Sequence, residues 1–169
     1  MGTTLGFIEK QTLINKRAHP VDASECAGHE WAIGGTNASL ECGQRHHALY
    51  VVDISTHNCL AIDAGLSLSA EGIINVLDQL KLERGLPTCI HVDKSSGSFS
   101  NGLQNWCDEH NVKLGYINNI SPSLGARIER FHQSFKAEFL SASSFLTLEQ
   151  FRELASIWRM NYNERANPN

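Results

Sequence analysis

The chain has 169 residues with a hydrophobic content of 41%, which suits one domain with a sizeable buried core. It carries 14 Lys and Arg residues against 18 Asp and Glu residues, a formal net charge of −4. This balance argues against strong autonomous binding to nucleic acid, because phosphate contacts supply most of the affinity of such proteins.

The sequence has no apolar run of the roughly 18 residues that a membrane-spanning helix needs. Its N-terminal region lacks a basic stretch followed by a long apolar one, so we expect no secretory signal and a cytoplasmic location. The five cysteines are irregularly spaced and include no C-x-x-C pair. We therefore expect reduced thiols rather than a structural zinc site.

Residues 1–28 are polar and weakly patterned, and we expect them to form an extended arm. Three strands are predicted next, because apolar and β-branched residues are concentrated in three short runs bounded by turn-forming residues. These strands are expected at residues 31–35, 46–54 and 59–64, with a hairpin turn over residues 36–44.

Helices and strands alternate in the rest of the chain. Ser69, Ser100 and Thr147 can each cap a helix, and Thr147 begins a Thr-Leu-Glu-Gln capping box. Apolar residues at helical spacing define helices over residues 69–85, 100–110, 124–139 and 147–162, and strands are expected at residues 88–92 and 112–117, with a loop over 118–123. The order predicts an α/β domain.

Two carboxylates stand out. Asp93 directly follows the apolar run 89–92, and Glu129 lies 36 positions later in a predicted helix. Carboxylates at a strand end and on a following helix can meet in space, and clustered acidic oxygens bind hard cations such as Mg²⁺ or Mn²⁺. Ordinary structural roles stay open: Asp93 can cap a turn, and Glu129 can pair with Arg130 or Lys136.

Seven short segments resemble, in order and spacing, the catalytic core of integrases and bacterial insertion-sequence transposases. They are Trp31-Ala32-Ile33, Tyr50-Val51-Val52-Asp53, Cys59-Leu60-Ala61-Ile62, Glu83-Arg84-Gly85-Leu86-Pro87, His91-Val92-Asp93, Ile128-Glu129-Arg130-Phe131 and Asn161-Tyr162-Asn163-Glu164. The resemblance implies a ribonuclease-H-like fold, with a central five-stranded mixed sheet flanked by helices. It divides the chain into an arm (1–28), a catalytic core (29–142) and the C-terminal helix of the core with a tail (143–169).

The resemblance also implies metal-dependent DNA strand transfer by an Asp, Asp, Glu triad, with Mg²⁺ or Mn²⁺ as cofactor. Asp93 and Glu129 would be the second and third triad members, as catalytic residues and metal ligands. The first triad position lies three residues after Trp31 and is Gly34. Lys94 stands where the family usually has Asn and adds a positive charge beside Asp93, which opposes metal binding.

We therefore expect metal binding to be weakened and this copy to be catalytically defective, although a displaced ligand would keep it an active enzyme. Four acidic side chains are candidates for such a ligand: Glu30, Glu41, Asp53 and Asp63. Of these, Asp53 is expected to be a structural turn residue.

By resemblance, four basic residues would contact DNA: Lys94, Arg127, Arg130 and Lys136. A solvated charged face explains them equally well. The partners implied are mobile-element ends and target DNA, with a homodimer left open and no membrane partner. A non-catalytic module for DNA contact or dimerisation, derived from a transposase, is the alternative function.

Overall fold

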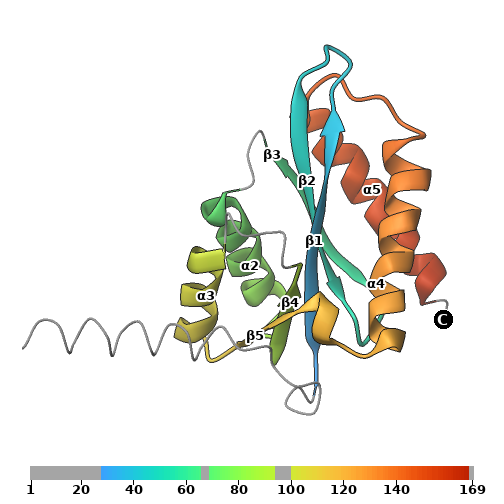
Figure 1. The fold of residues 1–169 in the computed structure, drawn as a ribbon. Helices are drawn as coiled ribbons and strands as arrows, with labels where there is room; N and C mark the ends of the chain where they lie inside the picture. The colour runs from blue at the N-terminus through green and yellow to red at the C-terminus, as the bar shows by residue number, and fades with distance from the viewer. Residues whose placement is uncertain (1–27, 66–68, 94–99, 168–169) are drawn as a thin grey trace, which may run out of the picture.

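The computed structural model describes residues 28–65, 69–93 and 100–167. A five-stranded mixed sheet runs through its centre (Figure 1). Strands β1 (Glu30–Ser39), β2 (Arg45–Asp53) and β3 (Cys59–Gly65) form an antiparallel meander. Strands β4 (Cys89–Val92) and β5 (Lys113–Tyr116) continue the sheet in parallel on the other side of β1, giving the order β3-β2-β1-β4-β5. The predicted five-stranded mixed sheet is confirmed.

Helices cover both faces of the sheet (Figure 1). On one face lie α2 (Ala70–Arg84) and α3 (Ser100–Glu109), and on the other lie α4 (Pro122–Ser134) and α5 (Leu148–Ala166). A π-helical segment, η3 (Phe135–Leu140), continues α4 without a break. Among the described residues, no helix is both long and apolar enough to cross a bilayer.

Alternation along the strands divides the buried side chains between two cores. Trp31 and Ile33 point into the cluster covered by α2 and α3, whereas Ala32 points into the cluster covered by α4 and α5. The apolar stripe predicted between residues 124 and 139 supplies the second cluster with Ile128 and a series of phenylalanines. The same alternation decides which residues of β1, β2 and β4 face α4.

The predicted helix boundaries follow from local capping. The Ser69 hydroxyl accepts a hydrogen bond from the Gly72 amide at 3.2 Å, and Gly85, with φ of 84°, ends α2. The Thr147 hydroxyl accepts from the Gln150 amide at 3.0 Å and begins α5. The capping box is shifted by one residue, because the Gln150 side chain accepts from the amide of Leu146 rather than that of Thr147.

Several boundaries differ from the prediction. β1 extends to Ser39, so the hairpin turn is shorter than residues 36–44, because the polar end of β1 pairs fully with the start of β2. Residues 118–123 are not a plain loop. A 3₁₀ turn spans Ile117–Asn119, and α4 begins at Pro122, where Ser121 caps it and a proline suits the first helical turn.

Some expectations concern residues outside the described part of the chain. The arm predicted over residues 1–28 falls there apart from Gly28, as does Lys94. Cys42, Cys59 and Cys107 are free thiols, as expected. Cys89 is disulfide-bonded, so the expectation of reduced cysteines is wrong at that position.

Candidate active site

Asp93 and Glu129 lie on the elements that the sequence predicts. Asp93 is exposed and follows the last residue of β4, and Glu129 is exposed on α4. The Glu129 carboxylate accepts a hydrogen bond from the Gln133 side chain, one turn further along the helix, at 2.7 Å. Neither of its predicted ion-pair partners, Arg130 and Lys136, forms a described salt bridge with it.

The backbone brings position 34, which the resemblance implies to be the first triad position, next to Asp93. Ile33 of β1 is paired with Val92 of β4, and both side chains point toward α2 and α3. Strand alternation therefore turns the next positions, Gly34 and Asp93, toward the face covered by α4. A side chain at position 34 would lie on the same face of the sheet as Asp93. That face is covered by α4, the helix that carries Glu129.

The space beside Gly34 is filled by an aromatic side chain. Gly34 is paired across the hairpin with Tyr50 of β2, whose ring lies over the glycine. A Cβ atom at position 34 would overlap the Cζ and hydroxyl oxygen of Tyr50 and would lie 2.6 Å from its Cε2. Any side chain at position 34 therefore requires the Tyr50 ring to move.

Tyr50 is held in place from the α4 side. Its side chain is buried, and its hydroxyl is hydrogen-bonded to Nδ1 of His132 on α4 at 2.8 Å. The ring packs edge-on against Phe131 and Phe135, with centroid distances of 4.8 and 5.7 Å. These contacts fix both the plane of the ring and the position of its hydroxyl.

The Tyr50 hydroxyl lies close enough to Glu129 and Asp93 for their negative charges to affect its pKa. Burial is the main cause that raises the pKa of the Tyr50 hydroxyl, and the negative charges of Glu129 and Asp93 raise it further. The hydroxyl therefore stays protonated and neutral. Burial lowers the pKa of His132, with Glu129 opposing that shift and Lys136 adding to it. A neutral Tyr–His pair thus lies beside both acidic residues.

The residues present do not fit a pair of divalent cations. Such a pair needs several anionic oxygens, and here the space beside Gly34, where the resemblance implies a carboxylate, holds the neutral phenol ring of Tyr50. Within residues 28–65, 69–93 and 100–167, no three His, Cys, Asp or Glu side chains are arranged to hold a metal ion. The exposed charged side chains, Asp93, Glu129, Arg130 and Lys136, can still form hydrogen bonds and ion pairs with a binding partner.

Asp53, one of the four candidate substitute ligands, is the last residue of β2 and caps the turn that follows, as predicted. One of its carboxylate oxygens accepts from the amides of Ser55 and Thr56 at 2.9 and 3.2 Å, and the other lies 3.2 Å from the His29 ring. One oxygen is thus bonded to the turn between β2 and β3, and the other contacts the residue that precedes β1. Asp53 is therefore not placed to replace the missing ligand.

The other substitutes are also engaged or remote. The Glu30 carboxylate lies 2.8 Å from Nε2 of buried His91, and the Asp63 carboxylate accepts from Arg152 of α5 at 2.7 Å. Glu41 lies exposed in the turn after β1. Among the described residues, none of these carboxylates belongs to a group of side chains that could hold a metal ion.

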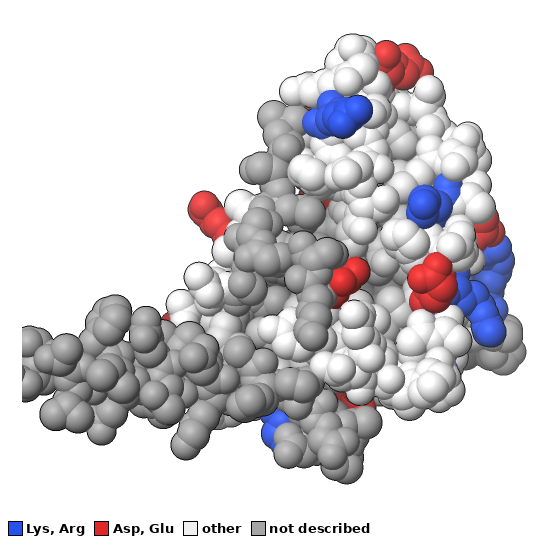
Figure 2. Space-filling view, viewed as in Figure 1, with Lys and Arg blue, Asp and Glu red and all other residues white. Residues whose placement is uncertain are grey.

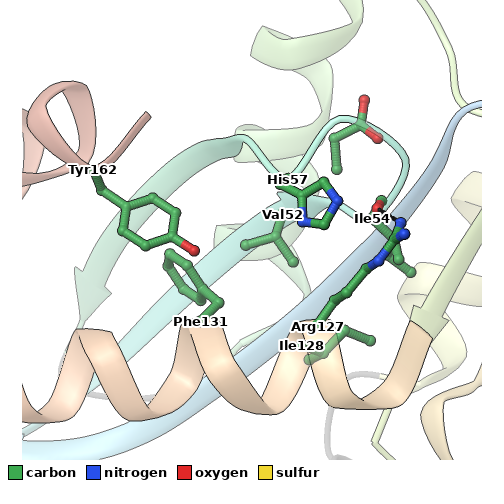
Figure 3. A pocket seen from close by; sticks show the side chains of 8 residues that line it. Val52, Ile54, His57, Arg127, Ile128, Phe131 and Tyr162 are labelled. Atoms are coloured by element: carbon green, nitrogen blue, oxygen red, sulfur yellow. Dashed lines mark hydrogen bonds between the residues drawn. The ribbon is translucent and has the colours of Figure 1, made fainter. Parts of the chain in front are cut away.

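The Arg127 guanidinium is engaged in a hydrogen bond within the protein. Its side chain reaches from α4 to the end of β2 and donates to the Ile54 carbonyl at 3.1 Å (Figure 3). It lines a small pocket with His57, Phe131 and Tyr162. Arg127 therefore ties α4 to the β2–β3 turn, which the sequence did not indicate.

Arg130 and Lys136 are exposed on α4 and η3, where the sequence placed them. Glu129 raises and Lys136 lowers the pKa of His132, so both charges lie near that ring. On the molecular face shown in Figure 2, basic side chains form separate patches with acidic ones among them. The described surface in that view carries no continuous basic band.

Sequence reasoning missed Tyr50 and His132. The resemblance predicts a lost metal ligand at position 34, but it does not predict that another side chain fills the space. A glycine inside a strand is itself a signal, because it allows a neighbouring side chain to lie against the backbone. Which side chain does so depends on the register of the hairpin, which local sequence does not give.

Comparisons with known proteins agree with this fold. A family model described as an integrase core domain matches residues 110–166. An uncharacterized 39.2 kDa protein of insertion element IS476 from Xanthomonas euvesicatoria is 28% identical over 142 residues, which are 84% of this chain. The chain spans 41% of the length of that relative.

Solved structures support the fold. The catalytic core domain of HTLV-2 integrase, in complex with magnesium, matches with a TM-score of 0.56 at 17% identity, over 79% of this chain and 86% of that one. The catalytic core domain of BIV integrase matches with a TM-score of 0.58 at 16% identity, over 78% and 82% of the two chains. With the sheet order and the integrase-core match over residues 110–166, these findings show that the chain has the ribonuclease-H-like fold of integrase catalytic cores.

Proposed function

We propose that this chain is a transposase core that contacts mobile-element and target DNA but does not catalyse metal-dependent strand transfer. The observation that carries the proposal is the Tyr50 ring, which fills the space beside Gly34 where the first triad carboxylate would lie. Asp93 and Glu129 are the remaining triad members, and binding of Mg²⁺ or Mn²⁺ to them is weak or lost.

The proposed DNA contacts are Lys94, Arg130 and Lys136, with Arg127 in a mainly structural role. The exposure of Arg130 and Lys136 on one element supports this assignment. The net charge of −4 and the scattered basic side chains favour weak binding that needs help from other parts of a larger protein. The chain spans 41% of the length of the insertion-element relative, which is consistent with help from other parts of a larger protein.

A second candidate function is self-association without catalysis. Three apolar side chains on α5, Leu154, Ile157 and Met160, have exposed fractions of 36, 57 and 57%. They recur every three residues, so they lie near one another on the helix surface and offer an apolar surface to a second copy. The HTLV-2 integrase core has been solved in a dimeric form, which supports the same possibility here.

Nicking of supercoiled plasmid with Mg²⁺ or Mn²⁺, paired with fluorescence anisotropy on a short DNA duplex, tests the first proposal. We expect no metal-dependent nicking by the unmodified protein, and weak duplex binding that falls as salt rises. Metal-dependent nicking that Asp93→Ala and Glu129→Ala both abolish would show an active enzyme. Absence of duplex binding at low salt would leave self-association as the function, to be measured by sedimentation.

A further inference from the structure

We propose that Tyr50 closes the metal position of this core, so that restoring a carboxylate at position 34 does not rebuild the site unless the Tyr50 ring is removed as well. The inference rests on the proposed function, because it explains how a core that does not bind the metal ions keeps its packing at their expected position. According to this inference, Gly34 on β1 and Tyr50 on β2 together cause the loss of metal binding, rather than Gly34 alone.

The first step of the argument is steric. Gly34 and Tyr50 are directly paired in the β1–β2 hairpin, and both face the core covered by α4. The Tyr50 ring atoms lie where a Cβ at position 34 would be. Even alanine at this position would overlap the ring, and aspartate would add a carboxylate in the same volume.

The second step is that the ring has little freedom to leave. Tyr50 is 3% exposed and contacts Phe131 and Phe135 edge-on. Both phenylalanines belong to a larger aromatic cluster that includes Trp158 and Tyr162 of α5. Displacing the ring would open a void in a close-packed core, which is unfavourable.

The third step concerns the hydroxyl. Its hydrogen bond to His132 joins β2 to α4 across 82 positions of sequence, beside Asp93 and Glu129. A neutral phenol adds no negative charge to these carboxylates, so it offers a dication no substitute for the missing aspartate. The Tyr50–His132 pair therefore connects the sheet to the helix without an ion.

Calorimetric titration with Mn²⁺ alone tests the inference on four proteins: the unmodified chain, Gly34→Asp, Tyr50→Val and the double variant Gly34→Asp/Tyr50→Val. Valine keeps a β-branched residue in the strand while removing the ring. We expect the double variant to bind Mn²⁺ at least about tenfold more tightly than either single variant. The matched control is Gly34→Asn/Tyr50→Val, which has the same shape without the charge and should not bind.

Equal Mn²⁺ binding by Gly34→Asp and the double variant would show that Tyr50 does not close the site. A folded double variant that fails to bind would also overturn the inference. Tight binding and metal-dependent nicking by the unmodified chain would instead refute the proposed function itself, so the two failures are distinguishable.

Thermal unfolding without metal gives a second test that does not require the site to be rebuilt. Gly34→Ala should lower the melting temperature in the unmodified background, because its Cβ overlaps the ring. In the Tyr50→Val background the same change should be neutral or stabilising, since alanine costs less backbone entropy than glycine. An equal effect of Gly34→Ala in both backgrounds would overturn the inference.

Discussion

The side-chain amide of Asn163 on α5 forms two hydrogen bonds with the backbone of Cys59 at the start of β3. Its oxygen accepts from the Cys59 amide at 2.7 Å, and its nitrogen donates to the Cys59 carbonyl at 2.9 Å. β3 is an edge strand, so its outer backbone groups have no neighbouring strand. The side-chain amide of Asn163 therefore provides hydrogen-bond partners for the amide and carbonyl of Cys59, and it fixes α5 against β3.

Asn163→Ala should therefore lower the free energy of unfolding by about 2 kcal/mol, because it removes two hydrogen bonds and leaves the Cys59 amide without its partner. Chemical denaturation measures the change. Asn161→Ala is the matched control, since Asn161 is exposed two positions earlier on the same helix and should change stability little. Equal effects of the two substitutions would show that the contact with Cys59 is not stabilising.

A second prediction concerns the contact between α2 and α3. The buried Trp106 indole donates to the Asp78 carboxylate at 2.8 Å. Asp78→Ala should destabilise the protein by roughly 1–3 kcal/mol, because the indole N–H loses its acceptor. Asp78→Asn keeps an acceptor oxygen and should recover most of the loss in the same denaturation experiment. Failure of asparagine to do better than alanine would contradict this explanation.

The third prediction is a pH dependence of stability from His46. This ring is 1% exposed, packs edge-on against Phe151 at a centroid distance of 4.9 Å, and has no hydrogen-bond partner for either nitrogen among the described residues. Burial, with a smaller effect of His47, lowers the pKa of His46 below its usual 6.5 in the folded state. The unfolded chain therefore binds the proton first as the pH falls.

Stability should consequently be complete above about pH 6.5 and should decline below it, with a slope of up to about 1.4 kcal/mol per pH unit from this residue. His46→Leu removes the titrating group at similar volume and should flatten the decline. Denaturation curves collected from pH 7.5 to pH 5 check the expectation. The same slope in the two proteins would exclude His46 as its source.

The fourth prediction separates DNA contact from structural support on α4. Arg130→Ala and Lys136→Ala should each weaken duplex binding and reduce the salt slope by about 1, without changing thermal stability. Arg127→Ala should instead lower the melting temperature, because its contact with the Ile54 carbonyl is lost. Arg152→Ala, on α5, serves as the control for a general loss of positive charge. Unchanged binding by both Arg130→Ala and Lys136→Ala would remove this face from the proposed interface.

Local sequence patterns predict the order of the elements and most of their ends. Ser69, Gly85 and Thr147 act through hydrogen bonds and backbone angles within a few residues, so their effects are visible locally. The same holds for the placement of Asp93 after a buried strand and Glu129 on an amphipathic helix. Local patterns are sufficient where the physical cause is local.

The side chain that occupies the candidate site depends instead on contacts between distant parts of the chain. Gly34 and Tyr50 meet because the hairpin register pairs them, and Tyr50 reaches His132 because α4 covers that face of the sheet. Arg127 likewise finds its partner on the turn after β2. Strand register and helix packing are set by the burial of the whole core, so the filling of the space beside Gly34 could not be derived from the residues around it.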